Sequence, residues 1–306
     1  MGDSRPTHHM PFPKNVHFGG GAWATSFHIG VAKALEEQWE EAKKQSDGSL
    51  SGKLCTNIEI SGDSAGAAIG AGMQLGMTWQ ELRALYLRLA QSARKGGVWC
   101  GRMSTYHEEM LDSILKDPRS VEKLKERGFS MGVTRFFNKY QRYTSWRDMK
   151  HLRECFHSSF HVPLYCAYKS GVDGKQGIDG GFSNTSENMK HIELSAGQGN
   201  TYNISMSPTI SEIAYPPSDE EVDRKISQGY LAAMTWEHGT PPLDTTSSGG
   251  NCFMAFVLFL RGIHFIFHVL QMLLCCCCCC KSDTSTGREG NNYETIQKEE
   301  EKEKSN

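Results

Sequence analysis

The sequence lacks a strong excess of charge of either sign. Its 306 residues contain 33 Lys and Arg and 35 Asp and Glu, which gives a formal net charge of −2. Nucleic-acid-binding proteins usually carry a basic excess or a basic stripe with interleaved aromatic residues, and neither is found in this chain. We therefore expect no nucleic-acid partner.

Cysteine spacing typical of a metal site is also missing. Of the 11 cysteines, six are consecutive, and Cys55, Cys100, Cys155, Cys166 and Cys252 show neither ligand spacing nor pairing. Nucleotide-binding sequences of the Gly-x-Gly-x-x-Gly or Gly-Lys-Ser/Thr type are absent as well. We expect no metal and no cofactor. Because Met1 to Pro13 has no apolar core of a secretory signal, we expect a reduced, cytosol-facing protein.

Hydrophobic patterning predicts short strands alternating with amphipathic helices. Phe27, Val31, Leu35 and Trp39 recur every fourth residue, which is typical of one buried helix face. Thr78 and Glu81 form a capping box. We expect strands near residues 16–18, 57–60, 130–136, 162–168 and 202–206, and helices near 22–44, 78–93, 107–116, 121–127 and 219–235. A further helix is expected to begin at Ala65, and Ser145 with Asp148 suggests another helix start. This order predicts an α/β fold with a mainly parallel sheet.

One stretch has the pattern of a nucleophile turn. Gly62-Asp63-Ser64-Ala65-Gly66 is a Gly-x-Ser-x-Gly sequence that follows a short strand and precedes a small-residue helix. A tight strand-to-helix turn lifts the serine hydroxyl clear of the sheet, and the helix start directs its N–H groups to the site. We predict Ser64 as a nucleophile. The pattern alone is also compatible with a glycine-rich helix start that merely packs closely on a sheet.

Acyl transfer also needs oxyanion donors and a base. Gly19, Gly20 and Gly21 follow a strand and offer backbone N–H groups that, with the N–H of Ala65, would form an oxyanion hole. For the base the residues leave two options. Asp179 in Asp179-Gly180-Gly181 would act directly, or His191 or His238 would complete a Ser-Asp-His triad.

The ordered set Gly19-Gly20-Gly21, Gly62 to Gly66 and Asp179-Gly180-Gly181 resembles the patatin-like phospholipase family. Further stretches over about residues 16 to 237 resemble its adipose triglyceride lipase-like group: Val16 to Leu35, Ser92 to Lys95, Val162 to Cys166, Ile204 to Pro208 and Gln228 to Tyr230. The resemblance implies a three-layer sandwich and a Ser–Asp dyad without histidine, with Ser64 as nucleophile and Asp179 as base. Two positions depart from the family: Trp23, where many members have Arg or Lys, and Asn184-Thr185, where many have Asn-Pro.

The C-terminal part has the composition of a lipid anchor. Residues 239–252 form a linker by composition, and Phe253 to Leu274 is long and apolar. Arg261, His264, His268 and Gln271 would fall on one helix stripe, which favours an interfacial helix over a spanning or a core helix. The expected membrane contacts are Phe253, Phe256, Phe259, Phe265 and Phe267, and the expected S-acylation sites are Cys275, Cys276, Cys277, Cys278, Cys279 and Cys280.

Together these features predict a 1–15 arm, a 16–238 acyl hydrolase domain, a 239–252 linker, a 253–280 membrane-associated helix with its cysteine run, and a disordered 281–306 tail. The predicted function is hydrolysis of glycerolipid esters, foremost triacylglycerol, at a membrane or lipid droplet. Phospholipase A or transacylase activity with the same dyad is one alternative, and a non-catalytic lipid-surface binding protein is another. The predicted partners are lipid, with a protein activator left open.

Overall fold

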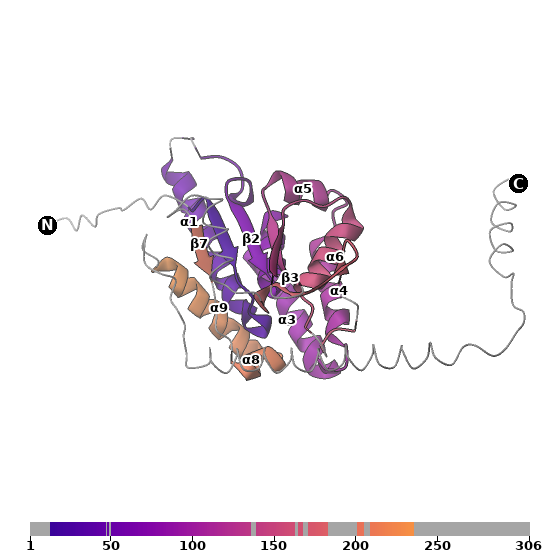
Figure 1. Ribbon diagram of the computed structural model, residues 1–306. Coiled ribbons are helices and arrows are strands. Elements are labelled where there is room, and N and C mark those ends of the chain that lie inside the picture. Colours follow the sequence, from indigo (N-terminus) through magenta and orange to yellow (C-terminus); the bar gives the residue numbers. More distant parts are fainter. Residues whose placement is uncertain are drawn as a thin grey trace, which may run out of the picture. The chain divides into compact units, whose positions relative to one another are not determined.

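The computed structural model describes residues 13–46, 48, 50–135, 139–162, 165–167, 171–182, 201–204 and 209–235 (Figure 1). All of these residues lie in one unit of the chain, Met1–Leu258. The predicted linker, the membrane-associated helix with its phenylalanines and cysteines, and the tail lie outside the described residues, as does all of the arm before Pro13. The domain division therefore stays a prediction.

The described elements follow the α/β order expected from the sequence. The strands are β1 (Asn15–Phe18), β2 (Glu59–Asp63), β3 (Ser130–Arg135), β4 (Lys139–Tyr143), β5 (Gly171–Val172), β6 (Lys175–Asp179) and β7 (Thr201–Ile204). The helices are α1 (Ser26–Gln45), α2 (Ala65–Gln74), α3 (Trp79–Gly96), α4 (Met103–Ile114), α5 (Ser120–Glu126), α6 (Met149–Ser159), α8 (Ile210–Ala214) and α9 (Asp219–Met234), with short 3-10 turns η1 (Ala22–Thr25), η2 (Leu54–Thr56) and η4 (Gly180–Phe182). Within the described ranges, no helix combines the length and the apolar character needed to cross a membrane.

The sheet is mixed rather than mainly parallel, which corrects the prediction. Its strand order is β5-β6-β3-β2-β1-β7, and β4 also pairs with β3. The pairs β1–β2, β1–β7 and β2–β3 are parallel, whereas β3–β4, β3–β6 and β5–β6 are antiparallel. The antiparallel half was not predicted because β4 and β5 are short and lack alternating hydrophobicity. The three-layer arrangement stays a prediction.

Strand β3 pairs with three neighbours, so two of them must share one of its edges. β2 runs parallel to β3 and ends with Asp63 opposite Gly132. β6 runs antiparallel to β3 and ends with Asp179 opposite Val133. Because Gly132 and Val133 are consecutive, the carboxyl ends of β2 and β6 meet head-on along the same edge. This meeting point places the residue after Asp63 beside Asp179, although the two are more than a hundred positions apart in sequence.

The two faces of the sheet differ in chemistry. Val16, Phe18 and Ile60 alternate to one face, which packs on α2; an added Cβ at Gly70 of α2 would lie 2.8 Å from Ile60 Cγ2 and 3.7 Å from Phe18 Cδ2. The intervening positions His17 and Ser61, which pair across β1 and β2, are polar and buried on the other face. One face thus forms a hydrophobic core, and the other holds buried polar groups.

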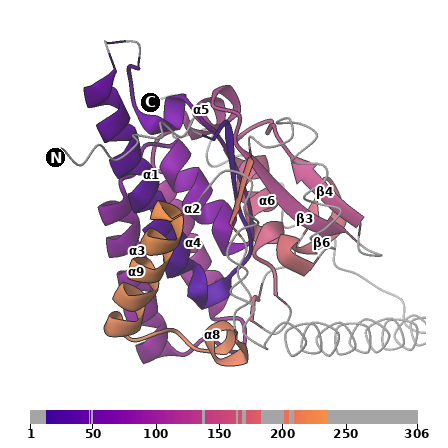
Figure 2. The ribbon, with the colours of Figure 1, turned by 90° about the vertical axis from the view of Figure 1, so that its left-hand side faces the viewer.

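Helix α9 packs along α1 at the edge of the described unit (Figure 2). The approach is so close that a Cβ at Gly229 would overlap the carbonyl oxygen of Phe27, and a Cβ at Gly30 would overlap the backbone of Ile226. Glycine is therefore required on both helices at the crossing. In this way α9 fixes the start of α1, which is separated from the glycine-rich loop by the short turn η1.

Most helix starts were predicted well, but two segments were not. The capping box at Thr78 is confirmed. The helix start suggested by Ser145 with Asp148 lies three residues later than expected, because Asp148 itself is the N-cap of α6 and accepts from the His151 N–H. The expected strand over 162–168 is wrong for its described residues. Residues 165–167 form a turn with one isolated bridge between Cys166 and Arg102. Its apolar side chains line a cavity instead of a sheet.

Candidate active site

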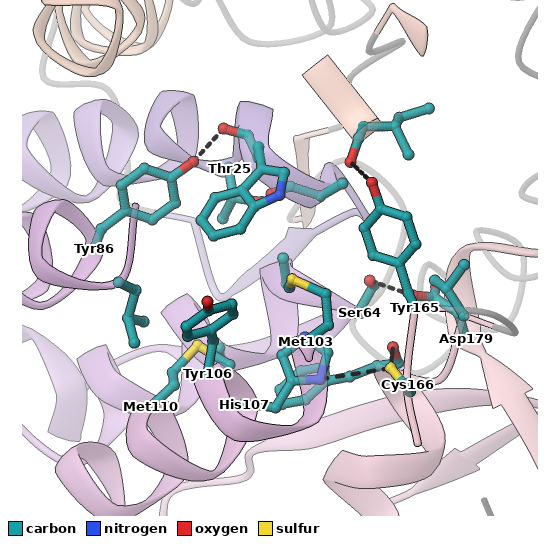
Figure 3. A pocket seen from close by; sticks show the side chains of 18 of the residues that line it. Thr25, Ser64, Tyr86, Met103, Tyr106, His107, Met110, Tyr165, Cys166 and Asp179 are labelled. Carbon is teal, nitrogen blue, oxygen red and sulfur yellow. Dashed lines mark hydrogen bonds between the residues drawn. The ribbon is translucent and has the colours of Figure 1, made fainter. Parts of the chain in front are cut away.

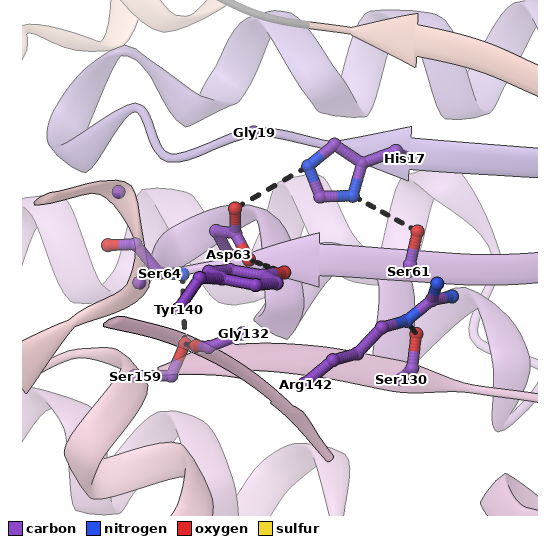
Figure 4. A network of polar contacts seen from close by, with 12 residues as sticks. His17, Gly19, Ser61, Asp63, Ser64, Ser130, Gly132, Tyr140, Arg142 and Ser159 are labelled. Carbon is purple, nitrogen blue, oxygen red and sulfur yellow. Dashed lines mark hydrogen bonds and ion pairs between the residues drawn. The ribbon is translucent and has the colours of Figure 1, made fainter. Parts of the chain in front are cut away.

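Ser64 lies at the strained turn between β2 and α2. Its φ of 52° and ψ of −135° are rare for a residue other than glycine. The backbone N–H of Ser64 donates to Ser159 Oγ at 3.0 Å, and the Ser159 hydroxyl donates to the carbonyl oxygen of Gly132 at 2.8 Å (Figure 4). Ser159, at the end of α6 and fully buried, therefore clamps the turn to β3.

Gly66 allows α2 to begin directly against β1. A Cβ at this position would overlap the carbonyl oxygens of Phe18 and Gly19. Any side chain here would push the helix start away from the glycine-rich loop. The glycine spacing around Ser64 thus has a packing cause: it brings the N–H groups of the first turn of α2 next to the loop that begins at Gly19.

The Ser64 hydroxyl donates to Asp179 Oδ2 at 2.5 Å (Figure 3). The other carboxylate oxygen, Oδ1, accepts from the backbone N–H of Gly181 at 2.8 Å. The backbone of Asp179 is held as well, because its N–H donates to the His161 carbonyl and its own carbonyl accepts from Thr134 Oγ1. The structure thus brings together the two residues predicted as nucleophile and base and fixes the carboxylate in one orientation.

Burial raises the pKa of Asp179 from 3.8 to about 7. The hydrogen bonds from Ser64 and Gly181 oppose this rise by stabilising the charged form, and the nearby negative charge of Asp63 adds to it. A carboxyl with a pKa near 7 holds a proton far more readily than an exposed aspartate. Asp179 can therefore both accept and return a proton near neutral pH.

The glycine-rich loop lies beside the serine, but Gly19 does not point its N–H at the site. A Cβ at Gly20 would lie 3.3 Å from Ser64 Cβ and 3.6 Å from Gly181 Cα. The N–H of Gly19 donates to the Ile204 carbonyl of β7 at 2.8 Å, which removes Gly19 from the predicted oxyanion donors. Gly20, Gly21 and Ala65 remain as the proposed donors.

His28 fixes the same loop from α1. Its Nε2 lies 2.8 Å from the Gly19 carbonyl oxygen and must donate, because a carbonyl only accepts. Burial is the main cause that lowers the pKa of His28 to about 4, so the ring is neutral at physiological pH. With both backbone groups of Gly19 bonded, the loop has a fixed position next to Ser64.

Ser64 and Asp179 open into a largely apolar cavity. Its empty volume is about 870 Å³, part of which is open to solvent (Figure 3). The walls come mainly from η1, α2, α3, α4 and the segment after α6, and the lining residues are Ala22, Trp23, Thr25, Ser64, Ala65, Ala68, Ile69, Tyr86, Leu89, Met103, Tyr106, His107, Met110, Phe160, Val162, Tyr165, Cys166, Asp179 and Ile213. An apolar lining of this kind suits an apolar ligand.

The polar side chains of the cavity wall are largely engaged with the protein. Tyr86 donates to the Trp23 carbonyl, and Tyr165 donates to the Ala214 carbonyl at 2.7 Å. Cys166 Sγ lies 3.8 Å from His107 Nδ1. Burial, helped by neighbouring histidines, lowers the pKa of His107 to about 3, so this ring is neutral. In the described part of the chain, no cluster of three or more His, Cys, Asp or Glu could hold a metal ion.

Several site residues were not found by sequence reasoning. Ser159, His28 and Thr134 act through hydrogen bonds to backbone groups of distant segments, and no local motif marks them. Conversely, His191 and His238, the candidates for a triad, lie outside the described residues. In a triad the aspartate contacts histidine rather than serine, whereas here Asp179 contacts Ser64 directly.

Comparisons with known proteins give structural likenesses at low sequence identity. No family model matches the sequence, and no curated protein matches it. Among solved structures, VipD from Legionella pneumophila aligns at 13% identity over 73% of this chain and 66% of its own, with a TM-score of 0.42. The type III effector ExoU aligns at 14% identity over 73% and 52%, with a TM-score of 0.36.

The heterodimeric complex ExoU-SpcU from the type III secretion system of Pseudomonas aeruginosa gives 12% identity over 73% and 51%, with a TM-score of 0.37. This chain thus spans between about half and two thirds of the length of these structures. Likenesses with TM-scores this low do not assign a function, and the chemistry must be inferred from the site.

Proposed function

We propose that the protein is a serine acyl hydrolase in which Ser64 and Asp179 form a catalytic dyad. The observation that carries this proposal is the 2.5 Å hydrogen bond from Ser64 Oγ to Asp179 Oδ2 at the wall of an apolar cavity. The strained backbone of Ser64 and the fixed orientation of Asp179 support it, because both are costly features that a purely structural serine would not need. The resemblance to patatin-like phospholipases points to the same dyad.

In the proposed reaction, Ser64 Oγ attacks the ester carbonyl carbon as its proton passes to Asp179 Oδ2. The tetrahedral intermediate collapses when the bond between carbonyl carbon and alcohol oxygen breaks, and the leaving alcohol takes the proton from Asp179. Water then attacks the acyl-serine and gives a proton to Asp179, and this proton returns to Ser64 as the fatty acid leaves. Asp179 thus serves as base and then as acid in each half-reaction.

The negative oxygen of the intermediate would be stabilised by the N–H groups of Gly20, Gly21 and Ala65. Gly20 lies beside Ser64, and Ala65 is the first residue of α2, where the helix dipole favours negative charge. Loss of one such donor typically lowers kcat by about 10²-fold to 10³-fold. These three groups are therefore proposed as the oxyanion hole.

The cavity lining favours a neutral ester with a long acyl chain. Among the described residues that line it, none is Lys or Arg, and His107 is neutral. A phosphate group therefore meets no cation at this wall, whereas an acyl chain meets Leu89, Met103 and Met110. We propose a glycerolipid ester as substrate, with triacylglycerol ahead of phospholipid. The proposed setting is a lipid surface facing the cytosol.

Labelling with a fluorophosphonate probe in the presence of lipid vesicles tests the dyad. We expect the wild-type protein to be labelled and the Ser64→Ala and Asp179→Asn variants to remain unlabelled. The matched control is Ser211→Ala, an exposed serine on α8, which we expect to label like wild type. Labelling that survives in Ser64→Ala would assign the nucleophile elsewhere. An unlabelled wild type would favour a lipid-binding protein without turnover.

Chain-length selectivity tests the role of the cavity. Met110→Trp places a bulkier side chain in the cavity wall, so we expect kcat/KM for long-chain esters to fall about tenfold relative to short-chain esters. The matched control is Met234→Trp, because Met234 is an exposed methionine on α9. Equal selectivity in both variants would show that the acyl chain binds elsewhere.

A further inference from the structure

A second buried carboxylate lies next to the proposed dyad, on the polar face of the sheet (Figure 4). Asp63, the last residue of β2, accepts a hydrogen bond from Tyr140 OH at 2.9 Å on Oδ1, and its Oδ2 lies 3.5 Å from His17 Nε2. Ser61 Oγ lies 3.0 Å from the other ring nitrogen, Nδ1. Because a carboxylate only accepts, Nε2 is the donor in its contact with Asp63.

Strand register places Asp63 directly behind the reacting groups. Asp63 of β2 pairs with Gly132, and Asp179 of β6 pairs with Val133. The two carboxylates therefore lie opposite consecutive residues of β3 and project to opposite faces of the sheet. The space around Asp63 is closed by glycines. A Cβ at Gly132 would overlap Asp63 Oδ1, and a Cβ at Gly180 would lie 3.3 Å from Asp63 Cβ. Asp63 also immediately precedes Ser64 in the chain.

Burial of Asp63 is unfavourable for folding alone. Only 3% of the residue is exposed, and a buried carboxylate loses its hydration. One tyrosine hydroxyl and one histidine N–H at 3.5 Å replace that hydration incompletely, and a well-packed neutral group usually stabilises a fold more than a buried charge does. Since β2 could end in an uncharged residue, the charge next to Ser64 calls for an explanation beyond packing.

We propose that Asp63 is a positioning residue for the proposed acyl transfer: it anchors the end of β2 behind Ser64 and places a negative charge that strengthens Asp179 as proton acceptor. This inference rests on the function proposed above. Tyr140 on β4 and His17 on β1 hold Asp63 from both neighbouring parts of the sheet, so the turn at Ser64 starts from a fixed point. Ser159 clamps the other side of the same turn.

The electrostatic half of the proposal follows from the groups that face Asp179. After burial, the charge of Asp63 is the remaining cause that raises the pKa of Asp179. Burial, the charge of Asp63 and the hydrogen bond to it hold the pKa of Tyr140 well above its usual range, so Tyr140 stays neutral and remains a donor. Among the described residues, other titratable side chains around this part of the site include His17 on β1, Arg142 on β4, and His107 and Cys166 on the cavity wall.

The Asp63→Asn variant tests this inference, since it keeps the shape of the side chain and an acceptor for Tyr140 but removes the charge. We expect the acidic limb of the kcat/KM profile for a soluble short-chain ester to move to lower pH by about half a unit or more. On the alkaline plateau we expect kcat to fall about threefold to tenfold because Asp179 is a weaker base, with KM unchanged. A structural role alone would lower stability without moving the pH profile.

The matched control is Asp223→Asn. Asp223 is an exposed residue of α9 that pairs with Arg83, so its removal changes the net charge equally but far from the site. We expect its pH profile to follow wild type. Tyr140→Phe is the second variant: it loosens Asp63 and keeps the charge, so we expect a severalfold lower kcat with the acidic limb in place. If Asp63→Asn does not fold, Tyr140→Phe decides, and a wild-type kcat in that variant would overturn the inference.

Infrared titration separates this inference from the proposed function. The carbonyl band of protonated Asp179, identified by its absence in Asp179→Asn, is followed against pH in wild type and in Asp63→Asn. An active wild type with the same band midpoint and the same kcat profile in Asp63→Asn overturns the role of Asp63 only. A wild type that neither labels nor hydrolyses esters overturns the proposed function, and the role of Asp63 with it.

Discussion

Helices α2 and α3 begin with the same kind of residue in opposite roles. Thr78, before α3, has an extended backbone (φ −76°, ψ 160°), and its side chain accepts from Glu81 N–H at 3.3 Å, while Glu81 Oε2 accepts from Thr78 N–H at 2.8 Å. Ser64, before α2, has a left-handed backbone (φ 52°), and its hydroxyl makes no capping bond. It donates to Asp179 instead.

The difference shows that the helix start at Ser64 is less stable than a normally capped one. A hydroxyl at a helix N-cap normally contributes about 1 kcal/mol, and Thr209 and Ser218 use theirs in this way, as Thr78 does. At Ser64 this contribution is lost, and a strained φ costs a further amount of roughly 1 kcal/mol or more. A capping residue that does not cap, in a strained turn beside a buried carboxylate, is therefore the local sign of a functional site.

The largest effect expected from this comparison is on activity. Ser64→Ala removes the proposed nucleophile, so we expect ester hydrolysis to fall by about 10⁴-fold or more. No capping bond is lost, but the hydrogen bond to the buried Asp179 carboxylate is, so the free energy of unfolding at pH 8 should fall by about 1–2 kcal/mol. Activity is followed with a soluble ester and stability by urea unfolding.

Ser64→Gly sharpens the same test. Glycine adopts a positive φ without strain, so this variant should be inactive and yet at least as stable as Ser64→Ala. A stability loss above about 3 kcal/mol in both variants would mean that the Ser64 hydroxyl contributes more to the fold than its bond to Asp179 accounts for.

The second-largest effect is on stability, at the second residue of each helix. Gly66 in α2 lies against the carbonyl oxygens of Phe18 and Gly19, so Gly66→Ala should cost about 3 kcal/mol or more, or prevent folding. Gln80 holds the same position in α3 and is exposed, so Gln80→Ala should change stability by less than about 0.5 kcal/mol. A well-tolerated Gly66→Ala would contradict the close crossing of α2 over β1. Thermal and urea unfolding measure both.

A third effect concerns pH, because activity and stability should respond to Asp179 in opposite directions. The folded-state pKa is raised to about 7, so kcat/KM should fall about tenfold for each pH unit below 7, where Asp179 is protonated. In folding, the native state keeps this proton between about pH 4 and 7 and the unfolded chain does not, so stability should decrease as pH rises through that window.

Asp179→Asn isolates this contribution. The variant should be inactive, and more stable than wild type at pH 8 by more than about 1 kcal/mol, with the difference disappearing near pH 4. Equal stability of the two proteins at pH 8 would show that the buried Asp179 carboxylate does not destabilise the fold as its raised pKa implies.

The contrast between the two helix starts also explains how much the sequence could predict. The start of α3 was placed correctly at Thr78 because a capping box is a local pattern of two residues three positions apart. The turn at Ser64 was predicted from its glycines, and the structure shows Gly66 fitting where no Cβ can. In each case the information lies within a few residues of the feature.

What could not be predicted depends on strand pairing. The head-on meeting of β2 and β6 along one edge of β3 is set by the registers of Asp63 with Gly132 and Asp179 with Val133. No spacing in the sequence reports such a register, so Asp63 was read only as the variable position of the Gly-x-Ser-x-Gly pattern. For the same reason the sequence offered Gly19 as an oxyanion donor, although β7 takes up its N–H.

The smallest effect expected is at the start of α3. Thr78→Ala removes the hydrogen bonds of the Thr78 hydroxyl to Glu81 at an exposed position and keeps the bond from the Thr78 backbone N–H. This should cost about 1 kcal/mol and lower Tm by roughly 2–4 °C. Activity should be unchanged, because within the described part of the chain the Thr78 hydroxyl bonds to Glu81 at the helix surface and to no group of the site. Thr78→Ser should recover most of the loss, since serine caps as well as threonine.

The pair of variants Thr78→Ala and Ser64→Ala then separates the capping role of a helix start from its catalytic role. Thr78→Ala should lower stability and spare catalysis, whereas Ser64→Ala should remove catalysis. If Thr78→Ala also lowered kcat, the start of α3 would be coupled to the site through α2. The two helix starts could then not be compared as independent features.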